Sequence, residues 1–172
     1  IKPEKTVETE LGFEMRMFNG HARADISLYN RRGQDQIFAV PVVTSSGFAT
    51  VTRNAGDLTN RGVELSVGVT PLRSETFTWD ARVNLARNWS KVKDLADGVE
   101  YIPLAGANSQ IRIVEDEPYG VIWGTRYQRN AQGQLLIGAD GFPLVDTESG
   151  KLGELLPNWL ANFGTAMSYR SF

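Results

Sequence analysis

Hydrophobic and polar residues alternate along five stretches of this chain. The alternation is uninterrupted from Phe77 to Leu85, where every second residue is apolar. A β-strand places successive side chains on opposite faces, so this pattern predicts a strand with one apolar and one polar face. The other stretches are residues 6–18, 21–30, 61–70 and 159–169. The sequence therefore predicts about five amphipathic strands and an all-β fold.

Aromatic residues bracket two of these strands at the same spacing. Trp79 and Trp89 lie ten residues apart on one face, and Trp159 and Tyr169 repeat that spacing. At about 3.3 Å per residue and a strand tilt of about 40°, this distance projects to about 25 Å along a barrel axis. The lipid-facing band between the two aromatic girdles of an outer-membrane barrel has this height. The pattern predicts a segment of an antiparallel up-and-down transmembrane β-barrel.

The predicted connections alternate between short and long. Asn19-Gly20 is a type I′ hairpin signal, since both residues tolerate positive φ, and residues 71–76 form a second short turn. The segments 31–60 and 91–158 are long and rich in Gly, Asn, Asp and Pro. Outer-membrane barrels have short periplasmic turns and longer extracellular loops, so we expect two long extracellular loops. The second long segment contains two further turn signals, Gln132-Gly133 and Asp140-Gly141.

This orientation assigns the four bracketing aromatic residues to two membrane interfaces. Trp89 and Trp159 adjoin the long segments, and we expect them at the outer interface. Trp79 and Tyr169 adjoin the short turns or the end of the last strand, and we expect them at the inner interface. Aromatic side chains are enriched at both interfaces because one end of the ring is apolar and the other tolerates water.

Composition changes this picture by what it excludes. Hydrophobic residues make up 41% of the chain and the mean hydropathy is -0.27. No stretch comes near the roughly 20 consecutive apolar residues that a membrane helix needs. The net charge of -2 and the pI near 5.5 lack the basic footprint of a nucleic-acid-binding protein. The chain has no cysteine, so a disulfide framework and a thiolate site are excluded.

The sequence contains no recognisable catalytic or metal site. His21 is the single histidine, so no second histidine shares a metal or completes a catalytic triad. The acidic groups around Asp94 and Asp116 lack the alternating ligand order of an EF-hand loop. A Gly-rich phosphate loop and a Gly-x-Ser-x-Gly elbow are also absent. We therefore predict no enzyme activity, no cofactor and no resident metal.

Charged side chains of the predicted strands fall mostly on the face opposite the aromatic residues. These charged side chains are of both signs. One interpretation is that they line a substrate path, and the simpler one is that they form hydrogen bonds to the plug and to interior water. Arg87 is the exception in its strand, because it shares the apolar face and lies beside Trp89. Contact with lipid phosphate and simple snorkelling both explain this position, and snorkelling is the plainer interpretation. The opposite set is Glu8, Glu10, Glu14, Arg16, Arg23, Asp25, Glu64, Asp80 and Arg82.

The second long segment carries the candidate ligand contacts. Aromatic rings beside amide and guanidinium groups suit sugar rings or peptide backbones, because they combine an apolar platform with hydrogen-bond partners. We predict ligand binding by Tyr119, Trp123, Arg126 and Tyr127. The alternative is that these rings pack the loop onto itself or onto a partner. The same segment also holds Tyr101, Asn108, Gln110 and Arg112.

A series of short motifs resembles the C-terminal barrel region of TonB-dependent receptors, in the Bacteroidetes-type SusC/RagA branch. Their order and spacing cover nearly the whole chain. They are Ile1-Lys2-Pro3-Glu4-Lys5-Thr6, Glu10-Leu11-Gly12-Phe13, Asp25-Ile26-Ser27-Leu28-Tyr29-Asn30, Asp35-Gln36-Ile37, Asn54-Ala55-Gly56, Asn60-Arg61-Gly62-Val63-Glu64-Leu65, Trp79-Asp80, Leu95-Ala96-Asp97-Gly98, Pro118-Tyr119-Gly120 and Leu156-Pro157-Asn158-Trp159.

The resemblance implies a fold, a location and a set of partners. Residues 1–172 would form part of a barrel of about 22 strands, with the plug domain and the TonB box outside this chain. The whole protein would import oligosaccharides or peptides through the Gram-negative outer membrane, driven by the TonB complex. Its partners would be its own plug domain, outer-membrane lipid and a SusD-like lipoprotein that acts as a lid over the long loops.

Two other functions remain open from the sequence. One is a TonB-dependent receptor for a siderophore or cobalamin, which works without a lid lipoprotein. The other is a soluble carbohydrate-binding β-sandwich, in which the apolar face would be a core. The sandwich would have to place two very long loops at one end, which is unusual for a compact domain.

Overall fold

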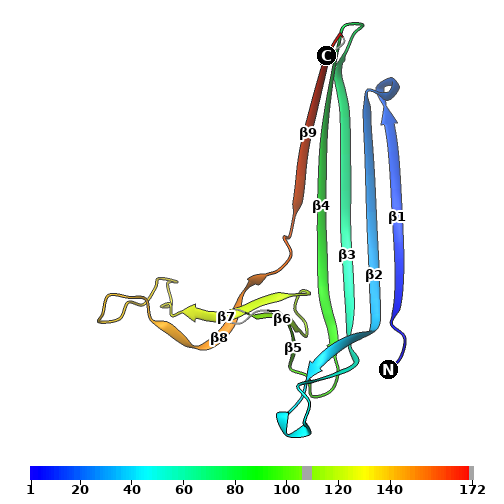
Figure 1. The fold of residues 1–172 in the computed structure, drawn as a ribbon. Coiled ribbons are helices and arrows are strands. Elements are labelled where there is room, and N and C mark those ends of the chain that lie inside the picture. The colour runs from blue at the N-terminus through cyan, green and yellow to red at the C-terminus, as the bar shows by residue number, and fades with distance from the viewer. Residues whose placement is uncertain (106–109, 171–172) are drawn as a thin grey trace. The chain divides into compact units, whose positions relative to one another are not determined.

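The computed structural model describes residues 1–105 and 110–170 and consists mainly of β-strands (Figure 1). One sheet has five strands in the order β1-β2-β3-β4-β9, and the other has four in the order β5-β6-β7-β8. The first sheet comprises β1 (Lys5–Met17), β2 (Ala22–Pro41), β3 (Thr50–Arg73), β4 (Phe77–Leu95) and β9 (Leu160–Tyr169). The second comprises β5 (Tyr101–Ala105), β6 (Gln110–Val114), β7 (Val121–Tyr127) and β8 (Val145–Glu154). No helix in the described part of the chain is long and apolar enough to cross a membrane.

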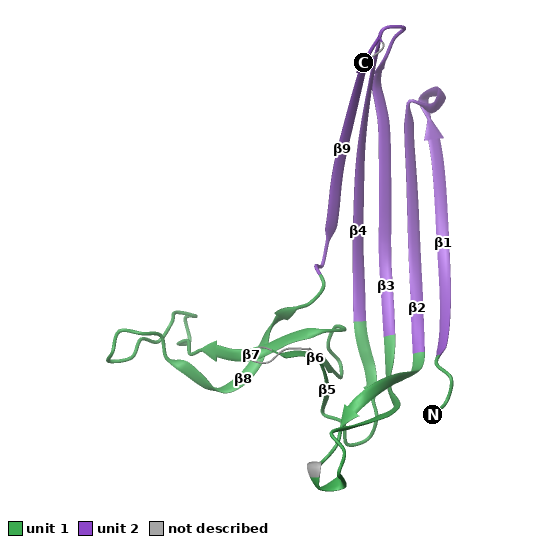
Figure 2. Ribbon diagram, viewed as in Figure 1, with its two compact units in different colours: residues 1–4, 34–58, 91–156 green, residues 5–33, 59–90, 157–172 purple. Residues whose placement is uncertain are grey.

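The chain divides into two compact units, coloured separately in Figure 2. Unit 1 contains residues 1–4, 34–58 and 91–156, and unit 2 contains residues 5–33, 59–90 and 157–172. The strands β2, β3 and β4 each contribute residues to both units. Unit 1 therefore holds the four-stranded sheet, and unit 2 holds β1, β9 and the adjoining parts of the three long strands.

The five predicted strands form the five-stranded sheet in the predicted up-and-down order. β4 and β9 pair antiparallel without a break, from Phe77 opposite Tyr169 to Ala86 opposite Leu160. The Asn19-Gly20 turn is type I′, since its φ angles are 54° and 86° and the His21 N–H donates to the Phe18 carbonyl at 3.1 Å. The all-β fold and this turn are confirmed.

The prediction of a long loop over residues 31–60 is wrong. β2 continues to Pro41 and β3 begins at Thr50, so only residues 42–49, with a 3₁₀ turn at Thr44–Ser46, connect them. The polar composition of this segment is compatible with strands because the backbone groups are paired across the ladder. Asp35 takes a positive φ of 56°, and its N–H donates to Asp57 Oδ1 at 3.0 Å. The predicted turn over 71–76 is shorter as well, because β3 extends to Arg73.

The second predicted long segment, residues 91–158, does connect two strands of the five-stranded sheet, and it contains strands of its own. β4 continues to Leu95, and β5 to β8 form a sheet of their own. Both predicted turns inside this segment are present: Gly133 and Gly141 have φ angles of 80° and 83°. Their N–H groups donate to the carbonyls of Asn130 and Gly138, at 2.9 and 3.0 Å. The segment is therefore folded, and its exposed turns lie between β7 and β8.

A hydrophobic cluster stabilises unit 1. Val92 and Ile113 are completely buried in it, and Tyr119 packs against it with partial exposure. Burial of side chains of this size contributes about 1.5 to 3 kcal/mol each. The cluster joins the ends of three long strands to β5 and β6 within this unit. Its buried members are Val40, Ala55, Val92, Leu95, Ile102 and Ile113.

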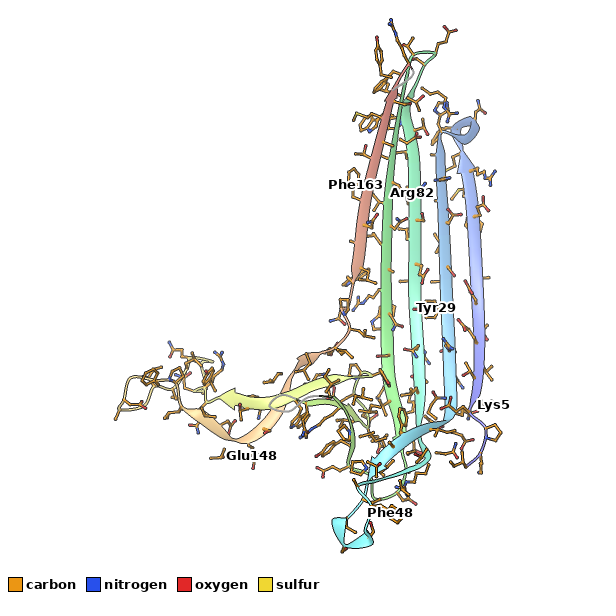
Figure 3. The ribbon with its side chains drawn as sticks, in the orientation of Figure 1. Lys5, Tyr29, Phe48, Arg82, Glu148 and Phe163 are labelled. Atoms are coloured by element: carbon orange, nitrogen blue, oxygen red, sulfur yellow. The ribbon has the colours of Figure 1, made fainter. Side chains whose placement is uncertain are left out.

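In unit 2, two glycines of β3 leave room for large side chains from β2. A Cβ atom at Gly62 would overlap the ring of Tyr29, and one at Gly68 would lie 2.8 Å from Nε of Arg23. Tyr29, labelled in Figure 3, also donates a hydrogen bond to Oδ1 of Asn88 at 3.2 Å. The tyrosine ring thus crosses β3 and joins β2 to β4 on one face of the sheet.

We predict that Gly62→Ala destabilises the sheet, because the added methyl group displaces the Tyr29 ring and breaks its bond to Asn88. Overpacking of this kind costs about 1 to 3 kcal/mol, so the midpoint of thermal unfolding of the full-length protein in detergent should fall. Gly12→Ala in β1 is the matched control, since no atom lies within 4 Å of its added Cβ. Equal midpoints for the two variants would contradict this role of Tyr29.

Candidate functional site

The apolar side chains of β4 and β9 share one face of the paired strands. Val83 lies opposite Phe163, and Trp79 lies opposite Met167. Phe163, labelled in Figure 3, has an exposed fraction of 67%, and that of Met167 is 63%. Exposing such large apolar side chains to water is unfavourable. They are expected on a face of the sheet that lipid covers.

Two of the predicted interface residues lie at the turn end of these paired strands. Tyr169 pairs with Phe77, two residues from Trp79 along β4. Nε1 of Trp79 donates to Oγ1 of Thr165 at 2.8 Å, so the polar end of the indole has a partner in the neighbouring strand. The structure therefore places Trp79 and Tyr169 within two residues of each other in the ladder, and their contact with the membrane remains a prediction.

The other two predicted interface residues meet at the opposite end. Cζ of Arg87 lies 4.5 Å from the ring centroid of Trp89 and 4.7 Å from that of Trp159. A guanidinium group within about 6 Å of an indole face is attracted by the ring quadrupole. Trp89 and Trp159 are thus joined through one arginine, although they are far apart in the sequence. Their place at the outer interface remains a prediction.

Polar side chains of the opposite parity bond to one another across strands. Oγ of Ser66 donates to Oδ1 of Asn84 at 2.8 Å, and Oγ1 of Thr70 donates to Oδ1 of Asp80 at 2.6 Å. Nδ1 of His21 lies 3.0 Å from the carbonyl oxygen of Thr70. These bonds show that the polar residues share one face, which is the predicted lumen face.

Two hollows follow this polar face within unit 2. The first, of about 580 Å³, is lined by groups that include Arg23, Asp80, Arg82 (Figure 3), Asn84 and Asn162. The second, of about 420 Å³, is lined by Glu8, Glu10, Ser27, Tyr29, Arg31, Asn60, Glu64 and Asn88. Their walls carry charges of both signs and many amide groups. Such a surface suits hydrogen bonding to water or to another polar protein surface more than capture of one specific ion.

In unit 1 the structure brings together Tyr101, Arg112 and Trp123 from three neighbouring strands. Cζ of Arg112 lies 4.0 Å from the centroid of the Tyr101 ring and 5.3 Å from that of Trp123. Nε of Arg112 also donates to Oε1 of Gln110 at 2.9 Å. Gln110 pairs with Trp123 in the ladder between β6 and β7. We call Tyr101, Arg112 and Trp123 the aromatic–arginine stack.

The other three predicted ligand contacts lie apart from this stack. Tyr119 packs against the hydrophobic cluster. Arg126 forms an ion pair with Asp146 at 3.6 Å, and its guanidinium lies against Gly150, where a Cβ atom would overlap it. Tyr127 ends β7 with 56% of its surface exposed. Asn108, also a candidate from the sequence, lies outside the described residues.

Lys151 is a neighbour of the stack that the sequence reasoning missed. It pairs with Trp123 in the ladder between β7 and β8. Its Nζ lies 2.6 Å from Oε2 of Glu117 and 3.2 Å from Oε1 of Glu154. No local pattern could have revealed the contact with Glu117, because 34 residues separate the two.

Hydrogen bonds to carboxylates shift two pKa values in unit 1. The bond that Lys151 donates to Glu117 raises the pKa of Lys151, with a smaller contribution from the bond to Glu154, while desolvation opposes the rise. The bond from Lys91 lowers the pKa of the exposed Asp116 carboxyl group. Among the described residues, no group of three or more His, Asp or Glu side chains could hold a metal ion.

Comparison with known proteins identifies the family. Residues 1–171 match the family described as TonB dependent receptor-like, beta-barrel. The chain belongs to this family. Family members of this kind are outer-membrane proteins, so the alternative of a soluble β-sandwich is excluded. The resemblance to the SusC/RagA branch and the all-β barrel fold are also confirmed.

Curated relatives are TonB-dependent receptors much longer than this chain. One from Formosa agariphila is 28% identical over 98% of this chain, which corresponds to 19% of that receptor. The TonB-dependent receptor SusC of Bacteroides thetaiotaomicron is 31% identical over 57% of this chain and 10% of its own length. The chain spans about a fifth of the length of the first of these relatives.

Solved structures show the same fold. The RagAB peptide importer in its closed-closed state superposes with a TM-score of 0.76 at 20% identity, over 96% of this chain and 20% of that chain. The RagAB peptide transporter gives a TM-score of 0.75 at 21% identity, over 97% of this chain and 20% of that chain. Both likenesses extend over both sheets, because they cover nearly the whole chain.

The alternation of faces in this receptor segment can be tested at two adjacent residues of β4. We predict that a spin label at Val83→Cys is accessible to oxygen dissolved in lipid, whereas one at Asn84→Cys is accessible to a water-soluble nickel chelate. The segment has no cysteine of its own, which simplifies labelling in the full-length receptor. Equal accessibility of the two positions to both reagents would contradict the assignment of the faces.

We also predict a pH-dependent contribution from Lys151. Its raised pKa means that the folded state holds the proton more tightly, so the ion pairs stabilise the protein below the ordinary lysine pKa. This contribution is lost as the pH rises through the raised value. Lys151→Met should therefore lower the stability by about 0.5 to 1 kcal/mol at neutral pH, and the difference should vanish in strong alkali. Thermal midpoints of the full-length receptor, measured from neutral pH to well above the ordinary lysine pKa, test this, and a difference that persists at all pH values would assign the effect to packing.

Proposed function

We propose that this chain is part of the barrel domain of a TonB-dependent importer of the SusC/RagA type, which takes up oligosaccharides or peptides. The plug domain and the TonB box would lie elsewhere in the longer protein. Membership of the receptor family supports the transport class, and the two-faced sheet of unit 2 supports a barrel wall. The observation that carries the substrate class is the aromatic–arginine stack in unit 1.

The stack has the properties of a contact surface for sugars or peptides. Arg112 and Trp123 lie on the ladder face that also carries Gln110, because Gln110 pairs with Trp123 and alternates with Arg112. Lys151 shares this face through its pairing with Trp123. Aromatic rings offer an apolar platform, while the amide, guanidinium and ammonium groups offer fixed donors beside it. Tyr127, at the end of β7 with more than half of its surface exposed, would be a further contact apart from the stack.

The stack is also organised before a ligand binds. Two ring contacts and the bond to Gln110 hold the guanidinium of Arg112 in one orientation. A fixed side chain loses less conformational entropy on binding than a mobile one. Tyr119 and Arg126, which the sequence also proposes as contacts, would act less directly, because Tyr119 packs against the hydrophobic cluster and Arg126 is paired with Asp146.

The proposed partner of this surface is a SusD-like lipoprotein lid on the extracellular side. Unit 1 offers two exposed elements for it, the connection 42–49 and the turns between β7 and β8. Phe48 and Phe142 have exposed fractions of 69% and 70%. Exposed aromatic side chains are enriched at protein interfaces. The TonB complex and the plug domain would engage parts of the protein beyond this chain.

We predict that Trp123→Ala combined with Arg112→Gln lowers the uptake of the oligosaccharide or peptide substrate at least tenfold. The level of receptor in the outer membrane should stay unchanged. The physical reason is the loss of the platform and its fixed donor, while the hydrophobic cluster remains intact. Growth is compared on an oligosaccharide mixture and on a peptide digest as the sole nutrient. Phe18→Ala, an exposed residue at the turn between β1 and β2 in unit 2, is the matched control for loss of an aromatic ring.

Two outcomes of this experiment would redirect the proposal. Growth equal to that of the parent on both nutrients would show that recognition lies elsewhere in the barrel. A defect confined to ferric siderophore or cobalamin uptake, measured in parallel, would support the alternative receptor class. A lid lipoprotein that co-purifies with the parent and with the double variant would show that the loss concerns the ligand and leaves assembly unaffected.

A further inference from the structure

Arg87 is clamped between two tryptophan rings on the apolar face of unit 2. Arg87 and Trp89 are two residues apart in β4 and therefore point to the same face. Trp159 precedes Leu160, which pairs with Ala86, so the register brings Trp159 opposite Arg87. The distances from Cζ of Arg87 to the two ring centroids, 4.5 and 4.7 Å, show that the guanidinium contacts both rings. We call these three residues the tryptophan clamp.

No anionic side chain of β4 or β9 accompanies Arg87 on this face. Arg87 is the only charged residue of its parity from Phe77 to Trp89, and the facing residues of that parity from Trp159 to Tyr169 carry no charge. Among the ion pairs of the described residues, none involves Arg87. Its Nε atom is buried and has no hydrogen-bond partner in the described part of the chain. The protein therefore supplies two aromatic faces for this cation and no anion.

Snorkelling alone does not account for this geometry. A snorkelling side chain extends freely towards water from an apolar stem, whereas this guanidinium is held by a ring in its own strand and a ring facing it from the other side. Both rings attract the guanidinium through cation–π contacts. These contacts fix the plane of the guanidinium and reduce the entropy that it would lose on binding an anion.

A second arginine lies near the clamp on the neighbouring strand. β3 and β4 are joined by the short turn 74–76, so residues equally distant from the turn lie level in the two antiparallel strands. Arg61 is thus level with Trp89, and it shares the parity of the apolar residues Val63 and Leu65. Its Nε donates to Oδ1 of Asn30 at 3.1 Å. Two cations are therefore present at one end of the apolar face.

We propose that the tryptophan clamp binds a phosphate group of lipid A, the phosphorylated glycolipid of the outer leaflet. The face that carries the clamp adjoins lipid in a barrel of this family, and tryptophan belts lie at the level of the headgroups. A guanidinium presents a planar fork of N–H donors that matches two phosphate oxygens. The outer leaflet follows from the proposed orientation, in which the end of β4 farther from the turn 74–76 is extracellular. The clamp would anchor one lipid molecule at the seam between β4 and β9.

The test measures lipid A bound to the full-length receptor in detergent by native mass spectrometry. The parent should retain phosphorylated lipid A and should bind the dephosphorylated form at least tenfold more weakly. Arg87→Gln should lower the affinity for the phosphorylated form about tenfold, to the level of the dephosphorylated form. Arg61→Gln should cause a smaller loss. Arg82→Gln, which removes the same charge from the other face of β4, is the matched control and should leave lipid binding unchanged.

Three results would overturn the proposal. Equal binding of phosphorylated and dephosphorylated lipid A by the parent would show that the tryptophan clamp does not recognise phosphate. Unchanged binding by Arg87→Gln would show that Arg87 does not contribute to the site. Displacement of lipid A by millimolar inorganic phosphate would indicate a site for the free anion.

Arg87→Lys keeps the charge and loses the planar fork of donors. If Arg87→Gln fails to assemble, weakened lipid binding by a folded Arg87→Lys receptor supports the proposal. Uptake measured in the same strains separates these results from those on the aromatic–arginine stack.

Discussion

The need to pair every backbone hydrogen-bonding group between strands underlies the membrane-facing part of this chain. Lipid offers no partners for N–H and C=O groups, so a spanning sheet must satisfy them within its own ladders. The unbroken pairing of β4 with β9, from Phe77–Tyr169 to Ala86–Leu160, meets this requirement. Because paired strands hold their side chains strictly on two faces, the same pairing decides which residues share each face of the sheet.

The two units differ in whether their apolar side chains are buried within the protein. All the buried hydrophobic residues of the described chain belong to unit 1, with Val92 and Ile113 at its centre. In the sheet of unit 2, apolar side chains such as Phe163 are exposed, and bonds such as Ser66–Asn84 form on the polar face. A single-layered sheet has no core of its own, and lipid takes the place of that core in a membrane barrel. Unit 1 needs no such support for its cluster.

Both units use arginine in the same way. Arg112 lies against Tyr101 and Trp123, and Arg87 lies against Trp89 and Trp159. In each case the aromatic rings orient the guanidinium without neutralising it, which leaves its charge available to a ligand. The difference lies in the surroundings. Arg112 has an amide and charged neighbours at hand, whereas Arg87 shares its face with apolar side chains.

The sequence by itself determined the features that depend on local geometry. The period of two identified the strands and their faces, the ten-residue spacing located the aromatic residues at the two ends, and Asn19-Gly20 predicted its turn because few residues tolerate positive φ. The tertiary structure alone decided the extent of β2 and β3, whose polar segments become strands only because neighbouring strands pair with them. It also decided that Tyr119 packs inward and that Lys151 meets Glu117. These contacts join residues far apart in the chain, and a local pattern contains no information about which distant side chain will lie beside a given strand.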